Sequence, residues 1–117
     1  MHVLDENKVL KKSYEDVVYI SQPFGATSLN TLAARALLFG LNPVSLKKAR
    51  VLELGCSFGG NIISQALYYP EASFTGIDLS SSQIKMGNEL IASIGLSNIH
   101  LLEKDILDID DSFGTFD

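Results

Sequence analysis

The chain has 117 residues, which is enough for one small domain and too few for two. Hydrophobic residues make up 46% of it and charged residues 20%, which is ordinary for a soluble globular protein. The net charge of −5 excludes the basic footprint of a nucleic-acid-binding domain, and no apolar run approaches the length of a membrane span.

The amino-terminal residues show no basic start, apolar core and cleavage site, so we expect no signal peptide. A single cysteine, Cys56, excludes an internal disulfide and fits a reducing, cytoplasmic location. No cluster of cysteine and histidine indicates a metal site.

We interpret residues 1–30 as an N-terminal arm. Residues 1–12 are polar and predict a frayed or weakly helical end. Residues 13–27 mix aromatic side chains with turn formers, which predicts an irregular segment.

A helix is predicted from the end of this arm to about Phe39. Ser28, Asn30 and Thr31 are favourable amino-terminal caps, and Gly40 suits the carboxyl-terminal cap. The positions expected to be buried on it are Leu32, Ala33, Ala36, Leu37 and Phe39.

The rest of the chain, residues 31–117, alternates between short apolar strands and amphipathic helices. Strands are predicted at 50–54, 73–78 and 98–104, helices at about 61–69 and 80–94, and the start of a fourth strand at 116–117. Strands separated by helices pair in parallel through right-handed crossovers. The pattern therefore predicts an α/β, Rossmann-like doubly wound parallel sheet, truncated to about three strands with flanking helices.

Each predicted strand ends in a group suited to ligand binding. The first strand delivers Glu53 and a glycine-rich loop, the second ends at Asp78, and Asp105 follows the third. Ligands of such sheets bind outside the carboxyl ends of the strands. We therefore expect three carboxylates around one crevice.

The glycine-rich loop fits a ligand that approaches the backbone closely. Gly55 and Gly59 have no side chain and tolerate a positive φ. Ser57 stands where a third glycine is common, and we interpret Cys56 as a small hydrophobic residue of the loop.

The acidic residues and their neighbours fit a nucleoside. Asp78 suits a ribose diol, because a carboxylate accepts two charge-assisted hydrogen bonds. Leu79 is placed to pack on an adenine face. Asp105 suits the adenine amino group, and the backbone amide of Ile106 suits a ring nitrogen.

Two ligands remain compatible with this pattern. The spacing Gly55-x-Ser57-x-x-Gly60 imitates a dinucleotide-binding fingerprint with the middle glycine lost. A carboxylate at Glu53, however, opposes a pyrophosphate at the following helix amino terminus. It suits S-adenosylmethionine, which has no phosphate and carries a sulfonium and an ammonium, so the acidic mouth favours the methyl donor.

Three motifs resemble those of class I methyltransferases. They are VLELGCSFGG at 51–60, FTGIDLS at 74–80 and the segment 98–106. The upstream segments 13–24 and 32–43 are similar to the opening of methyltransferases that have a regulatory domain, a group that includes rickettsial protein-lysine methyltransferases.

This resemblance implies S-adenosylmethionine as cofactor, 31–117 as part of its binding domain, and a methyl acceptor that is a protein in the subgroup. The cofactor-binding residues it implies are Glu53, Gly55, Cys56, Ser57, Gly59, Asp78, Leu79, Asp105 and Ile106. The resemblance places the aromatic residues Tyr14, Tyr19 and Phe24 over the opening of the cofactor site, and it implies Tyr14 and Tyr19 as substrate contacts.

A class I sheet has seven strands, and the chain supplies the first three and begins the fourth. The residues that hold and deprotonate the acceptor usually follow the fourth strand, so no catalytic residue is identified and these residues alone are expected to be inactive. A non-catalytic interaction module with a nucleotide pocket is the alternative. The apolar edge of the strand 50–54 predicts self-association or a complementing chain.

Overall fold

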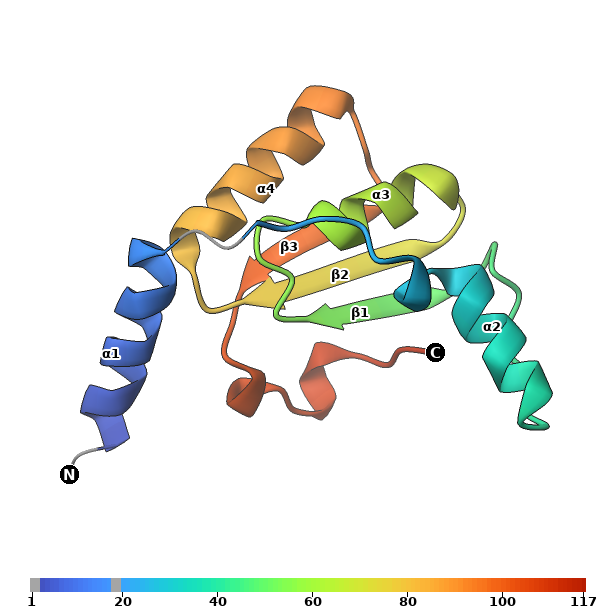
Figure 1. Ribbon diagram of the computed structural model, residues 1–117, viewed down its shortest axis with the longest axis horizontal. Helices are drawn as coiled ribbons and strands as arrows, with labels where there is room; N and C mark the ends of the chain where they lie inside the picture. The colour runs from blue at the N-terminus through green and yellow to red at the C-terminus, as the bar shows by residue number, and fades with distance from the viewer. Residues whose placement is uncertain (1–2, 18–19) are drawn as a thin grey trace.

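The computed structural model describes residues 3–17 and 20–117 (Figure 1). Its elements are α1 (Val3–Asp16), the 3₁₀ turn η1 (Gly25–Thr27), α2 (Leu29–Leu38), β1 (Arg50–Leu54), α3 (Gly60–Tyr68), β2 (Ser73–Asp78), α4 (Ser81–Ile94), β3 (Ile99–Glu103), η2 (Ile106–Asp108) and η3 (Asp111–Phe113). Tyr19 lies outside the described residues. None of the described helices combines the length and apolar character needed to cross a bilayer.

The sheet has three parallel strands in the order β1-β2-β3, which confirms the predicted fold class. Both crossovers step in the same direction, so α3 and α4 cover the same face of the sheet (Figure 1). At the free edge of β1, the Asp117 amide donates to the Arg50 carbonyl at 2.9 Å. The chain thus returns beside β1, where the fourth strand was predicted to begin.

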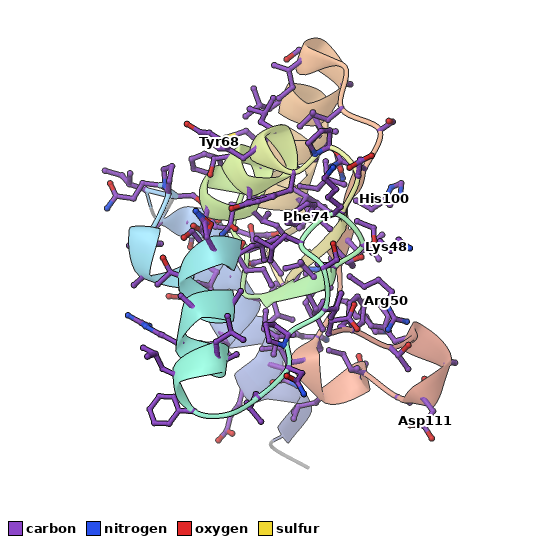
Figure 2. The ribbon with its side chains drawn as sticks, turned by 90° about the vertical axis from the view of Figure 1, so that its right-hand side faces the viewer. Lys48, Arg50, Tyr68, Phe74, His100 and Asp111 are labelled. Atoms are coloured by element: carbon purple, nitrogen blue, oxygen red, sulfur yellow. The ribbon has the colours of Figure 1, made fainter. Side chains whose placement is uncertain are left out.

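The core lies between the sheet and the two crossover helices. Phe74 of β2 is 1% exposed and sits at its centre, whereas Tyr68, His100 and Asp111 lie at the surface (Figure 2). The apolar stripe of α3 packs here because its buried positions recur with the helical period. The buried cluster contains Ile62, Ile63, Ala66, Phe74, Ile84, Ile91, Ile99 and Leu101.

Gly87 allows α4 to approach the sheet closely. A Cβ atom at this position would overlap the side chain of Leu101 and lie 2.6 Å from the carbonyl oxygen of Phe58.

The prediction for the N-terminal arm was wrong at residues 13–16. We expected a frayed or weakly helical end to residue 12 and an irregular segment from residue 13, whereas α1 continues without a break to Asp16. Contacts far along the chain hold its last turn. The Ser81 hydroxyl donates to Glu15 at 2.7 Å, and the Gln83 amide donates to the Tyr14 carbonyl at 3.1 Å.

The burial predicted for α2 was also wrong. Leu32, Leu37 and Phe39 are exposed, Ala33 and Ala36 are half-buried, and within α2 only Leu29 is buried. The helix touches the rest of the molecule through its amino-terminal end, where the Leu29 amide donates to the Gln65 side chain at 3.0 Å. The predicted end is confirmed, because Gly40 adopts a φ of 78°.

Candidate functional site

The strand register places Glu53 and Asp78 on the same face of the sheet. Glu53 pairs with Gly76, and side chains two residues apart on a strand share a face, so Asp78 points to the same side as Glu53. This is the face that α3 and α4 cover. Asp105 lies two residues beyond β3, at the same end of the sheet.

A pocket of about 430 Å³ opens at this end of the sheet. Its lining residues are Tyr14, Gly55, Ser57, Ile77, Asp78, Leu79, Gln83, Lys104, Asp105 and Ile106. The pocket therefore brings together residues from α1, the glycine loop and the ends of β2 and β3. Cys56 and Gly59 lie behind it, Cys56 against Gly76 and Gly59 against Ile63.

The glycine loop has the backbone that the sequence indicated. Gly55 and Gly59 have φ angles of 69° and 89°. Ser57, at the position where a third glycine is common, also adopts a positive φ of 56°, which is unusual for a residue with a side chain. A Cβ added at Gly55 would meet nothing within 4 Å among the described residues, so this part of the loop faces open space.

Asp78 joins the loop to the start of α4. Its Oδ2 accepts a hydrogen bond from the Ser57 amide at 2.9 Å, and its Oδ1 accepts one from the Ser80 amide at 2.9 Å. A carboxylate has about four acceptor positions, so both oxygens keep a lone pair for a ligand. Asp78 therefore shapes the pocket and also presents charge to it.

Glu53 lies at the base of the loop, beneath the amino terminus of α3. The Asn61 side-chain amide donates to its Oε1 at 2.5 Å, while Oε2 is buried and has no hydrogen-bond partner among the described residues. Burial raises the pKa of Glu53, and the hydrogen bonds from Asn61 and the Ile62 amide partly oppose that shift. A buried carboxylate oxygen without a partner is costly, and a cationic ligand would remove that cost.

Cys56 is unsuited to nucleophilic chemistry. Burial, with a smaller effect of the carboxylates of Asp78 and Glu53, raises its pKa to about 12. The thiol is therefore neutral at physiological pH and contributes by packing.

Asp105 begins η2. Its Oδ1 accepts a hydrogen bond from the Leu107 amide at 2.9 Å. The amide of Ile106 opens the same short helix, and the first amide of a helix has no partner within it. The edge of the pocket thus presents one acceptor and one donor of the kinds that adenine needs.

The N-terminal arm fills the amino terminus of α3. The Gly60 amide donates to the Ser21 hydroxyl at 2.7 Å, and a Cβ at Gly60 would overlap the Ser21 carbonyl. Ser21 and Glu53 together thus take the place where a dinucleotide pyrophosphate would sit. This geometry favours a nucleoside without a pyrophosphate.

Sequence reasoning missed the polar partners of the predicted residues. Asn61 and Ser21 gave no signal, because their roles depend on contacts between distant segments. Gln83 did give one, since Ser80-x-x-Gln83 is the signature of a capping box, in which Gln83 would reach back to the Ser80 amide. Here Asp78 takes that amide, which leaves the Gln83 side chain for the pocket wall.

Comparisons with known proteins agree with this geometry. A family model described as a methyltransferase domain matches residues 45–117. The chain is 45% identical to the Rickettsia prowazekii protein RP789 over 104 residues and 39% identical to RP028 of the same organism over 110 residues. These matches cover 89% and 94% of the chain but 19% and 44% of the two relatives.

Among solved structures, PKMT2 from Rickettsia typhi in complex with AdoHcy superposes with a TM-score of 0.81 and 39% identity. The match covers 85% of this chain and 19% of PKMT2. The sequence resemblance to class I methyltransferases, and to a rickettsial group of them, is confirmed. The chain belongs to the methyltransferase domain family.

Proposed function

We propose that the pocket binds S-adenosylmethionine and that the chain is the cofactor-binding part of a methyltransferase. The observation that carries the proposal is the buried, unpaired Oε2 of Glu53 beside a helix amino terminus that the arm already fills. A phosphate is disfavoured there and a cation is favoured. The match to PKMT2, solved with AdoHcy, supports the same assignment.

Each part of the nucleoside has a matching group in the chain. Glu53 would receive the ammonium of the methionine part, and the open backbone at Gly55 would lie against it. Asp78 would accept from the ribose hydroxyls. Leu79 and Ile106 would flank adenine, with Asp105 as acceptor for its amino group. Cys56, Ser57 and Gly59 would act by shaping the loop.

The cofactor supplies an electrophilic methyl group when it is bound. Transfer of that methyl group depends largely on holding donor and acceptor in line. The residues of this chain would orient the donor, exclude water from its adenosine half and keep the loop rigid. A protein lysine is the acceptor we propose, from the similarity to PKMT2 and the upstream segments. Tyr14 lines the pocket, and we propose it as a contact for the acceptor. The same role for Tyr19, and the cytoplasmic location, stay predictions.

Titration of the whole chain with AdoHcy and with NAD tests the proposal. We expect saturable binding of AdoHcy in the micromolar range and binding of NAD at least about ten-fold weaker, because the α3 amino terminus cannot receive a pyrophosphate. Isothermal titration calorimetry measures both. Equal or tighter binding of NAD, or no heat with millimolar AdoHcy, would contradict the proposal.

The variant Glu53→Gln tests whether Glu53 binds the amino-acid half of the ligand rather than its adenosine half. It should weaken AdoHcy about ten- to 100-fold, the usual cost of a lost charged hydrogen bond. It should leave methylthioadenosine, which lacks the amino-acid part, within about two-fold of wild type, because that ligand has no ammonium for Glu53. An equal loss for both ligands would place Glu53 outside the methionine site.

The same variant should stabilise the ligand-free chain. The raised pKa of Glu53 means that ionisation costs more in the folded state, so stability falls as pH rises from 4.5 through the folded pKa. Glu53→Gln should therefore unfold at higher urea concentration than wild type near neutral pH. Well below pH 4.5, where Glu53 is protonated in both states, the difference in urea midpoint between the variant and wild type should vanish.

A further inference from the structure

We propose that Asn61 and Gln83 are positioning residues that couple docking of the N-terminal arm to occupation of the pocket. Each of these buried side-chain amides bonds the arm backbone on one side. On the other side Gln83 bonds Ser57 of the pocket lining, and Asn61 bonds Glu53 at the base of the glycine loop. The inference rests on the proposed function, because it names what regulates that same site.

Gln83 makes this bridge at the adenosine end. Its side chain is buried, with the residue 2% exposed, and lines the pocket. Its Nε2 donates to the Tyr14 carbonyl at 3.1 Å, and its Oε1 accepts from the Ser57 hydroxyl. Ser57 is in turn held by Asp78 through its amide. Movement of the carboxyl end of α1 would therefore displace Ser57, the loop residue that is bonded to Asp78.

Asn61 makes the matching bridge at the methionine end. Asn61 is 8% exposed, and its Oδ1 accepts from the Phe24 amide at 2.9 Å. Its Nδ2 donates to Oε1 of Glu53, which orients the carboxylate so that Oε2 is the oxygen left for a ligand. Undocking of the arm at Phe24 would remove one of the bonds that fix the Asn61 side chain and would loosen Glu53.

Most other contacts of residues 3–17 and 20–24 with the rest of the described chain are polar. Ser21 receives the Gly60 amide, Ser81 donates to Glu15, and Lys11 pairs with Glu103 at the surface. The carboxyl end of the arm is held separately, because the Gln65 side chain donates to the Thr27 carbonyl and accepts from the Leu29 amide. Figure 1 shows α1 standing off the sheet at the end to which the strands point, with the arm running from it along α3. An element with few buried apolar contacts opens at low free energy, so a ligand that fixes Asn61 and Gln83 shifts the docked population of residues 3–17 and 20–24 measurably.

Coupling of this kind is reciprocal. If AdoHcy favours the docked arm by some factor, loss of the arm contacts lowers AdoHcy affinity by the same factor. Coupling free energies correspond to roughly 5- to 150-fold effects. One coupling factor therefore predicts both the protection of the arm by AdoHcy and the loss of AdoHcy affinity when the arm contacts are removed. A purely structural role of the two side-chain amides does not require these factors to be equal.

Limited trypsin digestion of the whole chain measures how often the arm undocks. Lys8 and Lys12 of α1 report on the arm, and exposed Lys47, outside it, is the internal reference. In wild type, saturating AdoHcy should slow cleavage at Lys8 and Lys12 about ten-fold. In Gln83→Met, which is apolar and of similar length, this protection should disappear and AdoHcy affinity should fall by the same factor.

Asn88→Leu is the matched control. Asn88 also lies on α4 and donates its side-chain amide to a backbone carbonyl, that of Leu101, at 3.0 Å. It therefore loses a comparable hydrogen bond without touching the arm. Both the protection by AdoHcy and the affinity should stay within about two-fold of wild type.

A second pair of variants perturbs the arm without changing either amide. Gly60→Ala puts a methyl group into the Ser21 carbonyl, whereas Gly25→Ala meets nothing within 4 Å among the described residues. Gly60→Ala should release the arm and abolish its protection by AdoHcy, and Gly25→Ala should not. The coupling is overturned if Gln83→Met and Gly60→Ala keep wild-type protection, or if wild type binds AdoHcy with no change at Lys8 and Lys12. If wild type fails to bind AdoHcy in the calorimeter, the proposed function itself fails.

Discussion

Asp78→Ala is expected to weaken AdoHcy binding at least about 100-fold. The carboxylate is placed to accept from two ribose hydroxyls, and a hydrogen bond to a charged group contributes about 1.5–3 kcal/mol. Two such bonds correspond to roughly 100- to 10,000-fold in affinity. The variant also removes the acceptor of the Ser57 amide, which holds a loop residue at positive φ. Calorimetric titration measures the loss.

Asp110→Ala is the control for this variant. The Asp110 Oδ1 accepts from the Ser112 amide at 2.9 Å, in the same two-residue turn that Asp78 makes with Ser80. It lies at η3, outside the pocket lining. AdoHcy affinity should therefore be unchanged in Asp110→Ala. Wild-type affinity in Asp78→Ala would show that the ligand binds elsewhere.

The sheet and its helices could be predicted from the sequence because local signals agreed with the global fold. Ser80 caps α4 by accepting from the Gln83 amide, and Gly95 ends it at a φ of 73°. The apolar residues Ile62, Ile63 and Ala66 of α3 are buried against the sheet, as an amphipathic helix between two parallel strands predicts. Where capping, periodicity and packing all favour the same element, sequence reasoning succeeds.

The two wrong predictions concern elements whose environment is set by distant contacts. The segment around Tyr14 is helical because residues of α4 bond to it. The residues near Tyr14 in the sequence do not indicate that α4 packs there. The apolar residues of α2 predicted a buried face, but the described residues cover only its amino-terminal end. Periodicity states which face is apolar, and only the tertiary structure states what covers it.

The site divides in the same way. Acidic residues at the ends of parallel strands are recognisable because topology alone brings them to one edge, as with Glu53 and Asp78. The side-chain amides of Asn61 and Gln83 are not recognisable, because each bonds an arm residue more than 30 positions away in the chain. The residue type and the strand-end position of a carboxylate indicate ligand binding from the sequence alone. The role of a positioning amide can be recognised only from the hydrogen bonds it makes in the folded structure.

Phe74→Ala is expected to lower the free energy of unfolding by about 3–5 kcal/mol, the usual cost of removing a buried phenylalanine. Phe74 is 1% exposed and lies in register with Val51 of β1 and Ile99 of β3, so the cavity would open at the centre of the sheet, where the structure relaxes least. The total free energy of unfolding of a small domain is only about 5–15 kcal/mol. Phe39→Ala, at a residue 84% exposed, should stay within about 0.5 kcal/mol of wild type. Urea unfolding followed by far-ultraviolet circular dichroism compares the two, and equal midpoints would mean that the core is not centred on Phe74.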